Sequence, residues 1–192
     1  MEKIYKHIAK TLKELRQKKG WSLDKTAAAT GVSKAMLGQI EREESSPTIA
    51  TLWKIATGFE TSFSSFIEDI QTASADAVHR TGQVQTIHPE DKNIRVLTLF
   101  PFDPELNFEL FVIELLPGCE HLSPAHKPGV MEHVVAVDGQ MEVFIDGDWH
   151  AIAKGEGIRF NANQPHGYRN LTSKAATFHD MIHYPGVKAD NS

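Results

Sequence analysis

The spacing of apolar residues changes part-way along the chain, and this change limits the possible folds more than any other feature. Up to about residue 70, apolar side chains recur every three or four residues, which is the period of an α-helix. Beyond that point, runs rich in Val, Ile and Phe have the period of β-strands and are separated by turns such as Asp138-Gly139. The 192 residues are enough for two domains. We therefore predict a helical domain over residues 1–70, a linker over 71–83 and an all-β domain over 84–192.

Cap residues divide the first domain into five short helices. Ser22, Ser33 and Thr48 are residues that accept a hydrogen bond at a helix start, and Gly20 and Gly31 suit the left-handed residue at a helix end. The predicted helices cover residues 4–15, 22–30, 33–42, a segment that begins at 47, and 62–70.

Many short strands at regular spacing are predicted in the second domain. The apolar runs cover residues 94–100, 108–116, 133–137, 141–145, 157–161 and 177–182. Short strands that alternate with turns are typical of a sandwich or barrel.

Charge is distributed unevenly between the two predicted domains. The whole chain has a formal net charge of −5, but residues 1–70 carry 11 Lys and Arg against 9 Asp and Glu, a balance of +2 that leaves −7 for residues 71–192. Eight of the basic residues fall within residues 1–25. Such a cluster suits a polyanion, although a solvated face of an amphipathic helix has the same composition.

Cysteine usage and hydropathy exclude several classes of protein. The single cysteine, Cys119, cannot form an internal disulfide framework or a multi-cysteine zinc site, so any metal must be bound by histidine and carboxylate. No apolar run approaches the roughly 20 residues of a membrane span, and the charged start lacks the features of a secretory signal. We expect a cytoplasmic protein with no membrane partner.

The second and third predicted helices have the composition of a tight helix-turn-helix corner. Ala27 allows the helices to approach closely, and Gly31 can adopt a positive φ between them. Gln39 can form two hydrogen bonds with adenine, and Lys34 can reach guanine or a phosphate. The side chains expected on the outer face, near the start of the third helix, are Ser33, Lys34, Ala35, Gly38 and Gln39.

These residues resemble the lambda-repressor-like (XRE) helix-turn-helix family over about residues 6–70. The resemblance rests on Arg16, the block from Ser22 to Ile40, Glu41 and the segment 47–56. It implies an ion pair between Arg16 and Glu41. It also implies that bases are contacted by Ser33, Lys34, Ala35 and Gln39, and phosphates by Ser22, Arg42 and Thr48. A half-site of a few base pairs gives too little discrimination for a specific operator, so we expect a homodimer on a near-palindromic, double-stranded DNA operator.

Two spaced motifs in the second domain resemble the cupin double-stranded β-helix barrel over about residues 84–185. The first motif of the family has the pattern G-x5-H-x-H-x3–4-E-x6-G. In this chain, Pro124 replaces the first histidine of that pattern, and one extra residue precedes the glutamate. The second has no gap, although Asn163 replaces a glycine. The matching residues are Gly118, His126, Glu132, Gly139, Gly155, His166 and Asn170.

The resemblance implies that His126, Glu132 and His166 face the mouth of one barrel. Two imidazoles and one carboxylate bind a divalent ion on one side and leave the other side open. We expect zinc, although iron, nickel and manganese accept the same ligands, and a metal-free pocket that grips an organic effector is the alternative. Candidate effector-binding residues are His121, which could also replace the missing ligand, Arg159, Tyr168 and His179.

A helix-turn-helix head and a cupin barrel in one chain resemble bacterial one-component regulators. The resemblance implies a sequence-specific DNA-binding transcriptional regulator, not an enzyme, whose barrel senses a small-molecule effector. An amino acid, whose amine and carboxylate could chelate the open face of the metal, is one hypothesis. A metal-dependent cupin enzyme with an autoregulatory DNA-binding head is the alternative.

Overall fold

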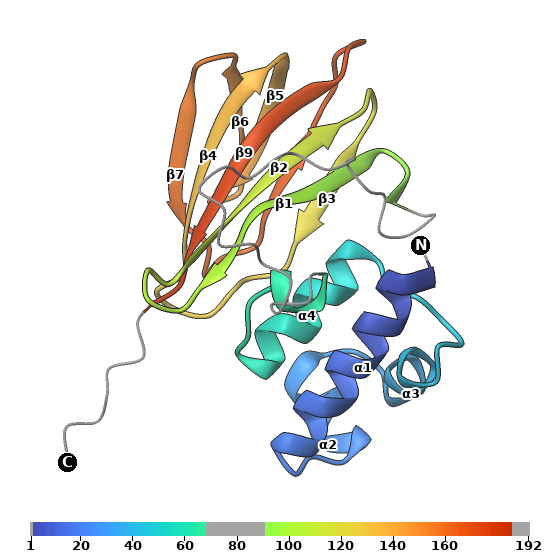
Figure 1. Cartoon of the computed structure of the whole chain (residues 1–192). Coiled ribbons are helices and arrows are strands. Elements are labelled where there is room, and N and C mark those ends of the chain that lie inside the picture. Colours follow the sequence, from blue (N-terminus) through green and yellow to red (C-terminus); the bar gives the residue numbers. More distant parts are fainter. Residues whose placement is uncertain (1, 68–90, 186–192) are drawn as a thin grey trace, which may run out of the picture.

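The chain forms a helical head packed against one end of a two-sheet β domain in a computed structural model that describes residues 2–67 and 91–185 (Figure 1). Four α-helices and one 3-10 turn, η1, form the described part of the head. Their bounds are α1 Glu2–Lys18, α2 Leu23–Thr30, α3 Lys34–Glu41, α4 Ile49–Phe59 and η1 Ser64–Phe66. The predicted linker, residues 71–83, lies outside the described residues.

The helices begin and end where the cap residues predict. The hydroxyls of Ser22, Ser33 and Thr48 each accept a hydrogen bond, at 3.2 Å, from the backbone N–H three residues later. Gly31 ends α2 with φ at 67°, in the left-handed region that glycine adopts without a steric penalty. Local hydrogen-bonding chemistry therefore determines these boundaries.

The prediction of a fifth helix over residues 62–70 is wrong in the part that the structure describes. Only the single 3-10 turn η1 forms there. The N–H groups of Phe63 and Ser64 donate to the Glu109 carboxylate of the β domain, at 3.1 and 3.0 Å. The hydroxyl of Ser65 donates to the carbonyl of Ser62 at 2.7 Å. These bonds to side chains compete with the helical pattern and keep the segment against the barrel.

The β domain consists of two antiparallel sheets. One sheet has the strand order β1-β2-β9-β4-β7, and the other has the order β3-β8-β5-β6. The bounds are β1 Ile94–Asp103, β2 Phe108–Leu115, β3 Glu120–Ser123, β4 Met131–Asp138, β5 Gln140–Ile145, β6 Asp148–Ala153, β7 Gly157–Asn161, β8 His166–Arg169 and β9 Ala176–His183. The order follows the cupin expectation, since strands distant in sequence, such as β2 and β9, pair along their whole length.

Three of these strands, β3, β6 and β8, have no counterpart among the predicted apolar runs. β3 and β8 have only four residues each, and β8 places the polar residues His166 and Tyr168 inside the domain. β6 is an edge strand, exposed at most of its positions. Hydropathy therefore gave no signal for β3 and β8, two of the strands that line the inside of the barrel.

Helix α4 and η1 close one end of the barrel (Figure 1). The ring of Phe111 in β2 packs edge-on against Phe63 at 5.6 Å and Trp53 at 6.3 Å, measured between ring centroids. Asp91, just before β1, accepts a hydrogen bond from the Ile49 N–H at 3.0 Å. The apolar core is thus continuous from the head into the barrel.

Candidate metal centre and nucleic-acid interface

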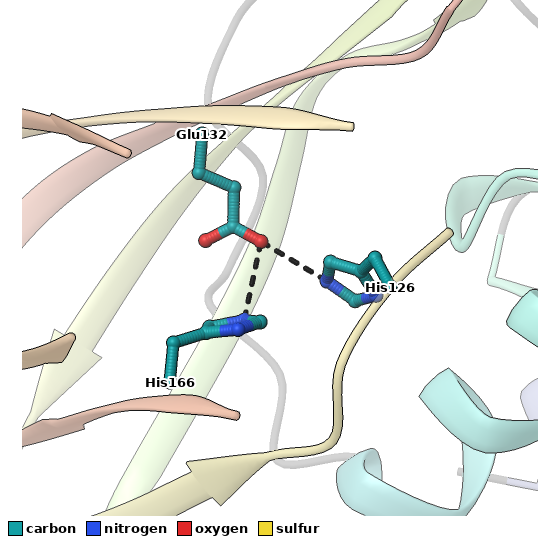
Figure 2. Close-up of side chains that lie close together, drawn as sticks. All are labelled: His126, Glu132 and His166. Atoms are coloured by element: carbon teal, nitrogen blue, oxygen red, sulfur yellow. Dashed lines mark ion pairs between the residues drawn. The ribbon is translucent and has the colours of Figure 1, made fainter. Parts of the chain in front are cut away.

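His126, Glu132 and His166 come together at the end of the barrel that faces the head. His126 lies in the segment between β3 and β4, Glu132 is in β4, and His166 begins β8. The Nε2 atoms of His126 and His166 lie 3.0 and 3.2 Å from the same carboxylate oxygen, Oε1 of Glu132 (Figure 2). All three residues are less than 10 % exposed. The structure thus assembles the three metal ligands that the cupin resemblance implies.

A hydrogen bond to the backbone determines which ring nitrogen of His166 carries the hydrogen and which has a free lone pair. Its Nδ1 lies 2.9 Å from the carbonyl oxygen of Gln164, and a carbonyl can only accept, so Nδ1 carries a hydrogen. In the neutral ring, Nε2 therefore presents a lone pair to a carboxylate oxygen. That arrangement is unfavourable unless a proton or a metal cation lies between the two atoms.

A divalent ion fits this arrangement. One ligand atom from each residue lies within 4.8 Å of the others, and ligands about 2.1 Å from a tetrahedral zinc ion are roughly 3.4 Å apart. Small shifts would therefore suffice for coordination. The bond from Nδ1 of His166 to a backbone carbonyl is the usual way in which a metal-binding histidine is oriented. Such an ion would supply Lewis-acid chemistry and an open coordination position.

The pKa shifts follow from burial and from the mutual charges. Burial alone would raise the pKa of Glu132, but the charges and hydrogen bonds of His166 and His126 outweigh it and lower that pKa. Burial lowers the pKa of the His166 ring, but the charge of Glu132 and the hydrogen bonds to Glu132 and Gln164 together outweigh burial and raise that pKa. The carboxylate is therefore ionised and available as a ligand.

Tyr168 and Asp180 support the carboxylate from the interior. The Tyr168 hydroxyl donates to Oε2 of Glu132, and its oxygen lies 3.5 Å from Oδ2 of Asp180. Burial, and next the charge of Glu132, raise the pKa of Asp180 well above its ordinary value. Its Oδ1 atom is buried and has no hydrogen-bond partner among the described residues. Asp180 is therefore a buried carboxyl with a raised pKa behind the candidate metal site.

The proposed DNA-contacting side chains of α3 lie on the outer face of the head. Ser33, Lys34, Ala35 and Gln39 are exposed, whereas Leu37 and Ile40 are buried. Helix α4 contacts the barrel, and α3 lies away from it (Figure 1). The barrel therefore leaves the predicted reading face uncovered.

Two basic candidate DNA contacts, Lys34 and Arg42, take part in exposed ion pairs. Lys34 forms an exposed ion pair with Asp24 at 2.8 Å, and Arg42 forms one with Glu44 at 2.7 Å. Exposed pairs of this kind contribute little energy, so a phosphate can replace the carboxylate. Ser22 is exposed and Thr48 half-buried, and both already cap helices.

Comparison with known proteins agrees with both halves of this description. The family described as "Helix-turn-helix" matches residues 12–66, and the family described as "Cupin domain" matches residues 111–182. The HTH-type transcriptional regulator SutR of Escherichia coli (strain K12) is 48% identical over 185 residues, which cover 96% of this chain and 99% of SutR. The chain belongs to the HTH-type transcriptional regulators with a cupin domain.

Two further proteins are similar to this regulator over most of its length. A crystal structure of an HTH_3 family transcriptional regulator from Vibrio cholerae has a TM-score of 0.84 and 47% identity, covering 95% of this chain and 97% of that one. The HTH-type transcriptional regulator PuuR of Escherichia coli (strain K12) is 24% identical over 165 residues, which cover 85% of this chain and 88% of PuuR. Among the described residues, no helix is long and apolar enough to cross a membrane.

The ion pair implied by the helix-turn-helix resemblance is present in this regulator. The Arg16 guanidinium donates to both carboxylate oxygens of Glu41, at 2.6 and 2.8 Å, and to the carbonyl of Trp21 at 3.1 Å. The Glu41 hydrogen bond, against a smaller effect of burial, raises the pKa of Arg16. This bidentate pair joins α1 to the end of α3 and so fixes the orientation of the reading helix.

The four effector-binding candidates fall into two groups. His121 and Tyr168 are paired across β3 and β8 and line a small cavity of about 20 Å³ inside the barrel. Burial and the charge of His166 lower the pKa of His121 to about 4, so its ring is neutral. Arg159 is exposed, and His179 alternates with the buried residues of β9, so neither of them lines that cavity.

Sequence analysis missed three residues of the site. Asp180 and Glu109 occupy inward positions of β9 and β2, where every neighbour at the same parity is apolar. A single carboxylate among apolar residues that share one face of a strand was the signal that could have revealed Asp180 and Glu109. The third residue, Trp53 of α4, packs on His126 with 4.8 Å between ring centroids. That contact links the two domains and has no signal in the sequence.

Proposed function

We propose that this regulator binds a near-palindromic operator as a homodimer through the outer face of α3. Ser33, Lys34, Ala35 and Gln39 would contact bases. The exposure of these side chains supports the assignment. Paired heads would place two α3 helices about 34 Å apart, one turn of DNA. Phosphate contacts are assigned to Ser22, Arg42 and Thr48, since each lies at or next to a helix end.

The β domain is proposed to be a sensor that holds a divalent ion and responds to a small-molecule effector. His126, Glu132 and His166 would hold the ion, and zinc is the first choice because it accepts two imidazoles and a carboxylate in a tetrahedral site. An amino acid is the proposed effector class. Tyr168 and Asp180 would keep Glu132 oriented as the site fills.

One observation carries this proposal: a metal ligand of the barrel contacts a helix of the DNA-binding head. Trp53 of α4 packs on the ring of His126, and Oγ1 of Thr57, one turn further along α4, lies 3.5 Å from Nδ1 of His126. Any movement of His126 on ligand binding must therefore displace α4 or separate the two domains. Coupling between a sensor site and a second site is typically 1 to 3 kcal/mol, a five- to 150-fold change in affinity.

The enzyme alternative is less compatible with the interior of the barrel. The inner cavity of about 20 Å³ beside the three ligands has room for roughly one water molecule. An organic substrate would require the barrel to open. We therefore infer a sensor, and the absence of turnover of bound amino acids by the zinc-loaded protein is the expected result.

Fluorescence anisotropy with DNA from the promoter beside the protein's own gene tests the proposal. The full chain is titrated into labelled DNA in the presence of zinc and then of a chelator. We expect tight, salt-sensitive binding whose affinity changes between the two conditions. His166→Ala should abolish metal content and this change but keep DNA binding. His150→Ala, at an exposed histidine of β6, is the matched control and should behave like the wild type.

Sequence-independent binding in every condition would exclude an operator-specific regulator. Loss of all DNA binding by a folded His166→Ala protein would exclude the model of a head that reads DNA while the barrel only modulates it. Bound metal with no effect on DNA affinity would exclude the metal from the sensing role.

A further inference from the structure

The inner cavity of the barrel is too small to be the effector site. Its volume of about 20 Å³ is slightly more than one water molecule requires. The side chains that limit it are bulky and mostly buried, among them Phe63, Phe111 and Tyr168. This space suits an ion and a solvent ligand. An effector larger than water needs another place.

A much larger cavity lies on the other side of His126 and Trp53, between the head and the barrel. Its volume is about 470 Å³, within the range of about 300 to 1,000 Å³ that is typical of small-molecule sites. His126 and Trp53 line both cavities. The two spaces therefore share a wall made of one metal ligand and one residue of the head.

The walls of this interdomain cavity combine hydroxyl groups of the head with aromatic rings of both domains. Helix α4 and the segment after it contribute hydroxyl groups, from Thr57, Thr61, Ser62 and Ser65. The barrel domain contributes Phe102 and Tyr184, whose rings pack edge-on at 5.4 Å. Hydroxyls offer both donors and acceptors, and aromatic faces accept an apolar group.

One cation and one anion that line the cavity pair directly with each other. Lys127 of the barrel domain forms an ion pair with Glu60, the C-cap residue of α4, and both side chains line the cavity. The Lys127 hydrogen bond lowers the pKa of Glu60, so the carboxylate is ionised. The two side chains are about half exposed, so the pair is weak and can be separated.

We propose that this interdomain cavity binds a small zwitterion, a free α-amino acid, between Lys127 and Glu60. The ligand's carboxylate would replace Glu60 beside Lys127, its ammonium would replace Lys127 beside Glu60, and its side chain would contact Trp53. The inference rests on the proposed sensing function and gives it a location and a ligand class. In contrast to chelation by the metal, protein charges select the ligand here.

Such a ligand would act on the DNA-binding head directly. Glu60 and Thr57 belong to α4 and its cap, and α4 packs so tightly on α2 that a Cβ on Gly58 would lie 2.7 Å from the Ala29 carbonyl oxygen. Helix α2 is the first helix of the helix-turn-helix. Insertion of a ligand between Glu60 and Lys127 would therefore shift α4, and with it α2 and α3.

Isothermal titration calorimetry on the full-length, zinc-loaded protein tests the site. Each of the common α-amino acids is titrated singly, and the tightest binder is compared with its decarboxylated amine and with its deaminated acid. We expect both analogues to bind at least about tenfold more weakly, because each loses one charge-assisted contact. Lys127→Met and Glu60→Gln should each weaken binding of the amino acid by a similar factor.

Matched variants separate this cavity from the barrel interior. Thr61→Trp fills the interdomain cavity and should abolish binding, while Thr61→Ser should retain it. Lys154→Met breaks an exposed ion pair with Asp138 on the surface of the barrel and should have no effect. Folding of each variant is checked by circular dichroism.

The result that overturns the proposal is binding that survives Thr61→Trp and Lys127→Met but is lost in Tyr168→Phe, which would place the effector inside the barrel. No binding of any amino acid at millimolar concentration would overturn the ligand class. Binding at the predicted residues without any change in DNA affinity would support the site and instead contradict the proposed sensing function.

Discussion

The indole ring of Trp53 lies 4.8 Å from the imidazole ring of His126, centroid to centroid, at an interplanar angle of 46°. One residue belongs to the fourth helix of the DNA-binding head and the other is a candidate metal ligand of the barrel. Trp53 also stacks on Phe63 at 4.3 Å, so its position is fixed from both sides. The metal site and the head are therefore in direct contact.

Metal binding should change the fluorescence of Trp53. A divalent ion on His126 alters the charge beside the indole, so zinc addition to the metal-free protein should shift its emission. The shift should disappear in Trp53→Phe and persist in Trp149→Phe, because Trp149 packs on Phe144 in the other sheet. A zinc-dependent shift that survives Trp53→Phe would contradict the contact.

The stability of the protein should fall with rising pH through the titration of Glu109. Burial raises the pKa of this carboxyl above its ordinary value, although the hydrogen bonds of Ser64 and Tyr184 oppose the shift. An acid whose pKa is raised on folding binds its proton more tightly in the folded state. The contribution of Glu109 to stability is therefore present below its pKa in the unfolded chain, about 4.3, and is lost as pH rises through its pKa in the folded protein.

Glu109→Gln removes this titration. Urea denaturation at several pH values from 5 to 8 measures the free energy of unfolding of both proteins. As pH rises, the free energy of unfolding of the wild type should fall relative to that of the variant. Parallel pH profiles would show that the Glu109 pKa is not raised. The same variant should weaken the attachment of the head to the β domain, because it loses an acceptor for the N–H of Phe63 or Ser64.

Loss of the Arg16–Glu41 pair should destabilise the head. Both side chains are largely buried, with 18% and 9% exposure, and hydrogen bonds to charged groups contribute roughly 1.5 to 3 kcal/mol. Glu41→Gln should therefore lower the free energy of unfolding by about 2 kcal/mol. The exposed pair Lys10–Glu14 is the control, and Glu14→Gln should cost less than about 0.5 kcal/mol. Equal losses would mean that the buried pair has no special role.

Gln39→Ala should relax the sequence preference at one base pair of the operator. A bidentate contact with a base contributes about 1 to 3 kcal/mol of discrimination. Binding to operators substituted one position at a time measures this directly. Gln17→Ala, at an exposed glutamine of α1, should leave the preference unchanged. If Gln39→Ala weakened binding equally for every substituted operator, Gln39 would instead contact a phosphate.

Gly58→Ala should destabilise the head although alanine is the better helix former. The added Cβ would lie 2.7 Å from the Cα and Cγ2 atoms of Thr30, so α4 and α2 must separate. Overpacking of this kind costs roughly 1 to 3 kcal/mol. At Gly38 the added Cβ would lie 3.1 Å from the flexible end of Arg42 and in ordinary contact with Leu23 at 3.7 Å, so Gly38→Ala should cost less in thermal denaturation. The reverse ranking would contradict tight packing between α2 and α4.

Local signals in the sequence were sufficient for the helix ends and for the metal ligands. Ser22, Ser33 and Thr48 cap helices because their hydroxyls bond to N–H groups three residues away, which is a local interaction. The motif spacing identified His126 and His166 because a barrel of fixed strand order brings those positions together. The fifth helix failed because the N–H groups at its start bond instead to Glu109, far along the chain.

The sequence by itself determined a helical domain followed by a β domain, most of their elements and the chemistry of three candidate ligands, because periodicity, caps and spaced motifs depend on residues close in the chain. Only the tertiary structure decided that α4 covers the mouth of the barrel, that Asp180 and not His179 faces inward, and that Glu60 and Lys127 line one cavity between the two domains. These facts depend on how the head docks on the barrel, and docking is determined by contacts between residues tens of positions apart.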